Sequence, residues 1–313
     1  MHLAVAIELE RRLIPAVEAL IAALVARSEP WQGLVKIGRT HLQDAVPLTL
    51  GQEVSGWIAQ LELGLDTLRA CQPQVHQLAI GGTAVGTGLN APAGFGEAAA
   101  RRLAERLGLP FTSAPYKFQA LAGHEALAAS HGALTVLAGS LMKIANDVRW
   151  LASGPRCGLG ELVLPENEPG SSIMPGKINP TQCESLTMVA VQVMGHNTAV
   201  QMAASQGQFQ LNVFKPLIAH NLLESSELLR GACAGFREHC VAGMEADEAR
   251  LAALVERSLM LVTALTPAIG YDRACAIARH AHHQGLSLRE AALALGGIDD
   301  ATLERCLRPE QMV

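Results

Sequence analysis

Apolar residues recur at three- and four-residue steps along most of the chain, which is the spacing of one face of an α-helix. The first such series contains Leu13, Val17, Leu20 and Leu24. Further helices are expected after Pro47, from about 118 to 151, from Pro180, and from about Pro216 to Phe236. The pattern therefore predicts an all-α fold built from long helices.

These expected helices are longer than most helices of globular proteins, and several are apolar around much of their circumference. Such helices need packing partners on every side. A chain of 313 residues cannot supply all of them, so we expect a homo-oligomer whose core is a helical bundle. A monomeric bundle or a solenoid is the alternative, and the lack of a repeat of about 20–50 residues disfavours the solenoid.

Three stretches interrupt the helical pattern. Residues 36–44 are expected to form a loop, 81–88 are rich in glycine, and 152–179 are rich in Gly, Pro and Ser. Beyond residue 245 the helical segments become shorter. We therefore predict a central helical-bundle domain over 1–245 and a small helical C-terminal domain over 246–313.

Composition narrows the functional class. The net charge is −5 and no basic run occurs, so a nucleic-acid partner is not expected. No continuous apolar run reaches the roughly 18 residues of a membrane span, and the first residues lack a secretory pattern. The seven cysteines contain no C-x-x-C pair, which favours reduced thiols. Together these features predict a cytoplasmic protein without a membrane partner.

The segment Gly170-Ser-Ser-Ile-Met-Pro-Gly-Lys-Ile-Asn-Pro180 has the chemistry of an anion site. Ser171 and Ser172 supply hydroxyl groups, Lys177 supplies a positive charge and Asn179 an amide. The helix that starts at Pro180 adds the positive end of its dipole. Such a loop can bind a dicarboxylate and stabilise negative charge that develops on it, although a surface turn is an equal alternative.

This segment resembles the signature of the fumarase/aspartase superfamily. With Gly176 and residues 181–184 as they stand here, the segment is similar to class II fumarase. Aspartases typically have Ala at the position of Gly176. Other stretches that resemble class II fumarase are 38–44, 81–90, 141–150 and 308–312. The resemblance spans essentially the whole chain and implies a long-helix bundle of the fumarase/aspartase type.

The resemblance also implies roles for three catalytic residues. Ser171 matches the serine that removes the C3 proton of malate, and His41 matches the histidine that handles the proton at the hydroxyl leaving C2. Glu184 matches the carboxylate that pairs with this histidine. A Glu partner orients the imidazole and raises its pKa.

Four further residues match substrate-binding positions, namely Thr40, Ser172, Lys177 and Asn179. The implied reaction is the reversible hydration of fumarate to L-malate, by anti addition and elimination through an aci-carboxylate carbanion. This is a reaction of the tricarboxylic acid cycle. No metal and no cofactor is expected. The family implies a homotetramer in which each site takes segments from three subunits.

In class II fumarases a Ser-Ser-Asn-Asp-x-x-Pro-Thr-Ala segment precedes the Met-His that stands here as Met1-His2. That substrate segment is not in this sequence, so we expect the chain alone to be nearly inactive. A non-catalytic scaffold, as in crystallin relatives, is one alternative. An aspartase-like ammonia-lyase is another, and Gly176 with residues 181–184 disfavours it.

Several other residues are weaker candidates. Thr83 and Thr87 can either contact substrate or serve the turn chemistry of the glycine-rich loop. His280, His282 and His283 are close in sequence, but on a helix they spread over different faces, which favours a solvated surface over a metal site. His131 and His220 are expected to be core or interface histidines.

Overall fold

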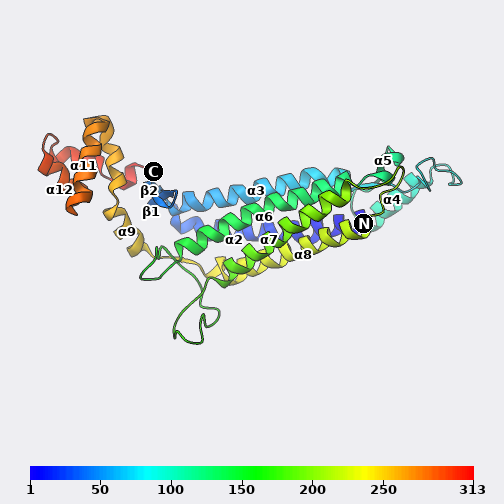
Figure 1. Cartoon of the computed structure of the whole chain (residues 1–313), viewed down its shortest axis with the longest axis horizontal. Coiled ribbons are helices and arrows are strands. Elements are labelled where there is room, and N and C mark those ends of the chain that lie inside the picture. Colours follow the sequence, from blue (N-terminus) through cyan, green and yellow to red (C-terminus); the bar gives the residue numbers. More distant parts are fainter. The chain divides into compact units, whose positions relative to one another are not determined.

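The computed structural model describes all residues, 1–313. Helices dominate it, and its six short strands form three two-stranded ribbons (Figure 1). The chain divides into two compact units. Unit 1 contains Met1–Ala23, Trp57–Trp150 and Pro165–Gly243, and unit 2 contains Leu24–Gly56, Leu151–Leu164 and Met244–Val313. The predicted all-α class is confirmed.

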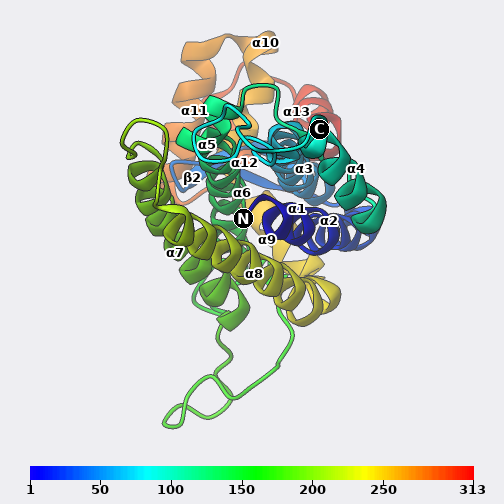
Figure 2. The same ribbon diagram turned by 90° about the vertical axis from the view of Figure 1, so that its right-hand side faces the viewer.

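Unit 1 is a bundle of long helices. Its first helical segment consists of α1 (His2–Glu8), a π-helical turn η1 (Leu9–Leu13) and α2 (Ile14–Ser28), which follow one another without a break. The other long helices are α3 (Leu50–Val75), α6 (Glu125–Leu151), α7 (Thr181–Ala204) and α8 (Lys215–His239). Figures 1 and 2 show α7 and α8 running alongside each other. The expected helices from Pro180 and Pro216 are therefore present.

The bundle core consists of the apolar residues that repeat at helical spacing. Residues with no exposed side-chain surface include Leu20, Leu61, Leu137, Leu141, Val193 and Leu229. Helices α3 and α6 approach closely at Gly64, where an added Cβ would lie 3.1 Å from Leu137 Cδ1. The buried Trp57 indole N–H donates to Asp147 Oδ2 at 3.0 Å and links the same two helices.

The predicted helix over 118–151 is wrong in one respect, because it is broken near its start. The short helix α5 (Lys117–Ala122) ends at Gly123, whose backbone is extended (φ −117°, ψ 162°). A Cβ at Gly123 would lie 2.4 Å from a Glu125 carboxylate oxygen. The chain turns there and restarts as α6.

The glycine-rich stretch over 81–88 forms a tight loop beside α4 (Phe95–Leu107) and α5, at one end of the bundle (Figure 1). Gly81 has φ 92°, and an added Cβ would lie 2.8 Å from Gly96 Cα. Gly86 has φ 108° and would bring a Cβ within 2.7 Å of the Phe118 ring. Strands β3 (Gln77–Leu78) and β4 (Thr112–Ser113) pair in parallel beside this loop.

Unit 2 contains a β-hairpin where the sequence predicted a loop over 36–44. Strands β1 (Val35–Thr40) and β2 (Gln43–Thr49) are antiparallel, with Val35 opposite Thr49. Pro47 lies within β2 and does not open the next helix, which begins at Leu50. The prediction failed because the alternation is short and because proline rarely occurs inside a strand.

The rest of unit 2 is made of short helices. They are η2 (Glu29–Trp31), α9 (Glu248–Arg257), η4 (Leu259–Leu265), α10 (Thr266–Ile269), α11 (Tyr271–Gln284), α12 (Leu288–Leu295), α13 (Asp300–Cys306) and η5 (Pro309–Gln311). Strands β5 (Leu162–Val163) and β6 (Glu245–Ala246) pair beside them, and η3 (Val241–Gly243) closes unit 1. Ile37 of the hairpin packs in one buried core with Leu265, Ile277 and Leu303. The domain boundary at 245–246 stays a prediction.

One helix, α6, is long and apolar enough by composition to cross a membrane, with a mean hydropathy of 1.3 over its most apolar window. In this structure 56% of that window is buried against the bundle. The bent pair formed by 248–257 and 259–269 passes the same composition test. A core helix of a bundle meets this criterion as readily as a membrane span does.

Candidate active site

The loop before α7 is closed by its own backbone. The Gly170 N–H donates to the Lys177 carbonyl oxygen at 2.8 Å, and the Asn179 side-chain amide donates to the Gly170 carbonyl oxygen at 2.6 Å. A Cβ at Gly170 would lie 2.5 Å from the Lys177 oxygen. Gly176 has φ 77°, which favours glycine. The loop of the sequence motif is therefore a defined turn.

Ser171 is the most engaged hydroxyl of this loop. Its Oγ accepts hydrogen bonds from the backbone N–H groups of Ile173 at 3.2 Å and Met174 at 3.1 Å. Hydrogen bonds donated to an oxygen favour its ionised form. The loop therefore provides what a serine base needs, namely donors that stabilise negative charge on the oxygen.

Two other predicted residues of the loop differ in their surroundings. The Lys177 side chain is exposed and forms no hydrogen bond or ion pair. Its ammonium group is thus free to meet an anion. One N–H of the Asn179 amide instead closes the loop, which leaves its second N–H and its oxygen for other partners.

Glu184 lies in the first turn of α7, where the helix dipole is positive. Its N–H donates to the Pro180 carbonyl oxygen at 3.1 Å, and its carboxylate is exposed and unpaired. Its carbonyl oxygen accepts from the Thr187 hydroxyl at 2.8 Å. An anion at this helix start is favoured by the same partial positive charge that favours Glu184.

The other two predicted residues stand at the tip of the unit 2 hairpin. Thr40 ends β1 opposite Gln43, and the two residues between them are His41 and Leu42. Both have left-handed backbone, with φ 57° and 59°. A two-residue hairpin turn of type I′ requires a positive φ at both central positions, where Asn and Gly are favoured. Non-glycine residues there store strain, and such strain is concentrated at functional sites.

A buried ion cluster supports this hairpin. The Lys36 ammonium lies 3.0 Å from the Glu53 carboxylate and 3.1 Å from that of Glu161. Arg39 donates to the second oxygen of Glu161 at 2.6 Å. Glu161 and Lys36 are 0% and 1% exposed. This cluster could not be predicted, because no sequence pattern pairs a Glu from the loop after α6 with a strand.

The structure gathers Ser171, Ser172, Lys177 and Asn179 in one loop, with Glu184 one helical turn further along the chain. Thr40 and His41 belong to unit 2. The pairing of Glu184 with His41 stays a prediction.

The weaker candidates lie elsewhere. Thr83 and Thr87 are exposed in the glycine-rich loop, and Thr83 has φ 54°, which is rare for a β-branched residue. His280, His282 and His283 lie on α11, and no group of three His, Cys, Asp or Glu side chains is placed to hold a metal ion. His131 is fully buried, whereas His220 is exposed and pairs with Glu224 at 3.1 Å.

Comparison with known proteins gives a consistent assignment. Residues 1–195 match the family model described as "Lyase", and residues 261–313 match the model described as "Fumarase C C-terminus". The chain is 62% identical to a class II fumarate hydratase of Chromobacterium violaceum, over all of this chain and 68% of that protein. It is 55% identical to a mitochondrial fumarate hydratase of Rhizopus oryzae, over all of this chain and 63% of that protein.

Solved structures agree. A class II fumarase from Schistosoma mansoni superposes with a TM-score of 0.97 at 44% identity, covering 100% of this chain and 68% of that one. A fumarate lyase:delta crystallin from Brucella melitensis, bound to cobalt, gives 0.93 at 41% identity, covering 99% and 67%. The chain thus spans about two thirds of the length of these relatives. It belongs to the class II fumarate hydratase family.

Proposed function

We propose that this chain carries three parts of a site that interconverts L-malate and fumarate. They are the base Ser171, the lysine that binds a substrate carboxylate, Lys177, and the histidine His41. In the elimination direction the Ser171 oxygen takes the C3 proton, and the electron pair moves into the neighbouring carboxylate to give an aci-carboxylate. The C2–oxygen bond then breaks. The leaving hydroxyl is protonated at the end of the site that faces His41, and it departs as water. Hydration is the reverse sequence.

The observation that carries this proposal is the setting of Ser171. Two backbone N–H groups donate to its oxygen, and the exposed, unpaired Lys177 ammonium stands in the same loop. A proton beside a carboxylate is very weakly acidic, so catalysis depends on charge stabilisation that is already in place. The loop and the start of α7 supply N–H donors, a cation and a helix dipole for that purpose.

Thr40, Ser172 and Asn179 are proposed to hold the substrate, and Glu184 is proposed to pair with His41 and orient its imidazole. This pairing requires the hairpin tip and the start of α7 to meet in the assembled protein. We propose that they do so in a homotetramer with sites shared between subunits. The relatives support a fumarate and malate site, and they include both bacterial and mitochondrial proteins. A cytoplasmic location and a place in the tricarboxylic acid cycle are therefore proposals for this chain.

The surface of α7 supports assembly. Its exposed residues Met188, Val191, Gly195, Thr198 and Met202 follow one another at alternating three- and four-residue steps. Met188, Val191 and Met202 are 65%, 60% and 64% exposed. This is the spacing of a helix seam that packs against another helix, and Gly195 permits a close approach. A second copy of the same bundle is the proposed partner.

Substitution of Ser171 tests the proposed reaction. Turnover of malate is measured as absorbance of fumarate, both for this chain and for this chain joined to the part of the Chromobacterium relative that the match does not cover. Ser171→Ala should lower kcat by about a thousandfold in whichever form is active, because a positioned base contributes about that much. The control Ser205→Ala removes an exposed hydroxyl at the end of α7 and should leave kcat unchanged.

Three outcomes would contradict the proposal. Full activity of Ser171→Ala would remove that serine from the base role. Aspartate as the main product from fumarate and ammonium would assign an ammonia-lyase instead. Absence of turnover in both forms, with helical circular dichroism intact, would support the scaffold alternative.

A further inference from the structure

Unit 1 holds two thiols in contact at one end of the bundle, where α7 begins and α8 ends. Cys183 is the third residue of α7, and Cys240 follows the last residue of α8. The two helices run alongside each other (Figures 1 and 2). An added Cβ at Gly235 would lie 3.4 Å from Gln182 Oε1, so the first turn of α7 lies against the last turns of α8. The Cys240 thiol donates a hydrogen bond to the Cys183 sulfur, and both cysteines are free.

The surroundings of Cys183 favour its thiolate. The residue lies in the first turn of α7, where the helix dipole is positive. Arg149 of α6 reaches this part of α7, because its Nη2 donates to Thr187 Oγ1 at 3.3 Å, one helical turn beyond Cys183. The hydrogen bond from Cys240 is the main cause that lowers the pKa of Cys183, and Arg149 lowers it further, whereas burial opposes both. A helix N-terminus and a neighbouring cation are typical surroundings of a reactive cysteine.

The two other thiols of this region differ from Cys183. The shared hydrogen bond and burial raise the pKa of Cys240, so this thiol keeps its proton. Cys233 is fully buried on α8, and burial raises its pKa to about 12. The pair therefore combines an activated thiol with a protonated thiol within reach, whereas Cys233 is an inert core residue.

We propose that Cys183 and Cys240 form a site of oxidation by hydrogen peroxide, which joins them in a disulfide. The Cys183 sulfur attacks one peroxide oxygen and the O–O bond breaks. The released hydroxide takes the proton that Cys183 gave up and becomes water, which leaves a sulfenic acid on Cys183. The Cys240 sulfur then attacks the Cys183 sulfur, the S–O bond breaks, and the hydroxyl leaves as water with the Cys240 proton. The two thiols lose two electrons, and peroxide is reduced to two molecules of water.

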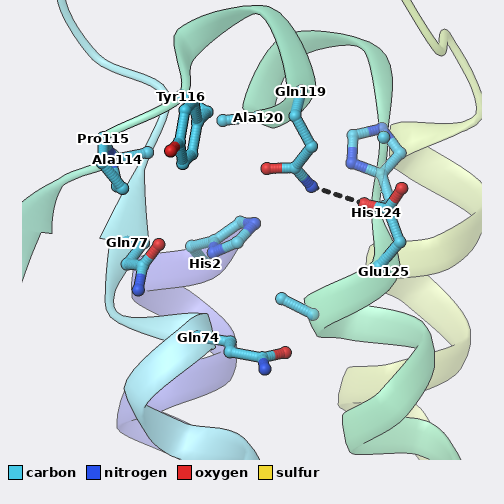
Figure 3. Close-up of a pocket in the computed structure, with 12 residues that line it drawn as sticks. His2, Gln74, Gln77, Ala114, Pro115, Tyr116, Gln119, Ala120, His124 and Glu125 are labelled. Carbon is cyan, nitrogen blue, oxygen red and sulfur yellow. Dashed lines mark hydrogen bonds between the residues drawn. The ribbon is translucent and has the colours of Figure 1, made fainter.

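Burial restricts which oxidants reach the pair, because Cys183 is 0% and Cys240 is 2% exposed. A cavity of about 400 Å³ in unit 1 gives no access to it. This cavity lies at the start of α6, beside His2 and Glu125 (Figure 3), whereas Arg149 is near the other end of that helix. Both thiols stand at helix ends, which open locally at low free energy. A small, uncharged oxidant such as hydrogen peroxide is therefore the class that fits.

The pair also lies beside both anchors of the loop that contains Ser171. Before the loop, Asn167 Nδ2 donates to the carbonyl oxygen of His239, next to Cys240, at 2.7 Å. After the loop, the chain enters the first turn of α7, which contains Cys183. A disulfide joins these two anchors covalently, so the modification acts at the base of the loop rather than within it.

Peptide mapping after treatment of the chain with hydrogen peroxide tests the proposal. Trypsin places Cys183 in peptide 178–230, Cys240 in 238–250 and Cys233 in 231–237, so mass spectrometry reports each thiol separately. We expect the first two peptides to be joined, with the loss of two hydrogen atoms. Cys183 should be oxidised at least about tenfold faster than Cys233.

Three variants separate the roles of the thiols. Cys240→Ala should stop the reaction at a sulfenic acid on Cys183, which dimedone traps, and Cys183→Ala should leave Cys240 reduced. The matched control Cys233→Ala removes a buried thiol from the same helix and should leave the disulfide unchanged. If a variant does not fold, peptide mapping of the chain without substitutions decides.

Three results would overturn the proposal. One is a reduced Cys183 in a sample whose exposed Cys157 is fully oxidised. Another is a disulfide that joins Cys183 to a cysteine other than Cys240. The third is an equal rate of oxidation for Cys183 and Cys233.

Discussion

Among single residues, His131 shows how burial fixes a protonation state. The Gln192 amide faces His196 Nε2 at 2.7 Å, so His196 Nδ1 donates to Ser225 Oγ at 3.0 Å. The Ser225 hydroxyl then donates to His131 Nε2 at 3.0 Å, and His131 Nδ1 donates to Asn197 Oδ1 at 3.2 Å. This directed series crosses α6, α7 and α8. It requires a neutral His131, and burial lowers the pKa of that ring to about 4.

Stability should therefore fall on acidification through this histidine. In the unfolded chain the imidazole titrates at about 6.5, and in the folded chain at about 4. Between these values the unfolded state binds the extra proton, so stability is present above pH 6.5 and is lost as the pH falls toward 4. The contribution amounts to about 3 kcal/mol at most. Urea unfolding at neutral and acidic pH measures it.

His131→Gln removes the titrating ring, so its free energy of unfolding should depend less on pH over this range than that of the unmodified chain. His220→Gln serves as the control, because His220 is 73% exposed in its side chain and should leave the pH dependence unchanged. An equal acid loss in the His131 variant would show that other groups, such as His2 and His124, set it.

Several site residues could be predicted from the sequence at this scale, and some of their roles could not. The motif around Ser171 predicted a shaped loop, and the structure contains a hydrogen-bonded turn there, whereas its binding of an anion stays a prediction. The sequence did not reveal that the Asn179 amide closes the loop, because that contact depends on where residue 170 lies in space. His131 was expected in a core, but its hydrogen-bond direction depends on three helices at once.

Among the elements, the unit 2 hairpin depends on buried ion pairs. Lys36 and Arg39 on β1 share the carboxylate of Glu161, which comes from the loop after α6. Desolvated ions are tolerated only while they remain paired. The hairpin and its strained tip at His41 are thus tied to the loop over 151–164.

Glu161→Gln should destabilise unit 2 by about 3 kcal/mol, because it leaves two cations with only Glu53 to share. Thermal or urea unfolding followed by circular dichroism measures the loss. Asp300→Asn breaks the exposed pair with Arg289 and should cost less than about 1 kcal/mol. A loss as small as that control in Glu161→Gln would mean that the cluster is not a structural requirement.

Element prediction succeeded where apolar periodicity was long and failed where it was short. Helices α7 and α8 span many turns, so their spacing is unambiguous. The hairpin has too few residues for its alternation to stand out, and Pro47 argued against a strand. The break at Gly123 was missed because apolar residues stand on both sides of it, at Leu121 and Leu127, while the extended backbone leaves no room for a Cβ beside the Glu125 carboxylate.

At the scale of the whole molecule, the exposed seam of α7 predicts assembly. Val191→Asp places a charge in the middle of the seam and should shift a tetramer toward smaller species at micromolar concentration. Mass photometry or sedimentation measures the distribution. Leu295→Asp is the matched control, since it charges an exposed apolar residue of α12 in unit 2 and should not change assembly. A monomer before any substitution would rule the tetramer out.

The overall class of the fold followed from the sequence, whereas the division into units did not. Long apolar helices predict a bundle whatever their partners. Unit 2 is held together by contacts between the hairpin, residues 151–164 and the C-terminal helices. These three segments are far apart along the chain. Local patterns carry no information about such distant pairings.

The interleaving of the two units also sets an order for folding on the ribosome. Unit 1 has all its segments once the chain has been synthesised through Gly243. Unit 2 holds two of its three segments by then, but its core lacks Leu265, Ile277 and Leu303, which are translated later. The hairpin of unit 2 therefore lacks these core partners at a time when the segments of unit 1 can already pack together. Slower translation after residue 243 would prolong the interval in which the hairpin lacks these core partners.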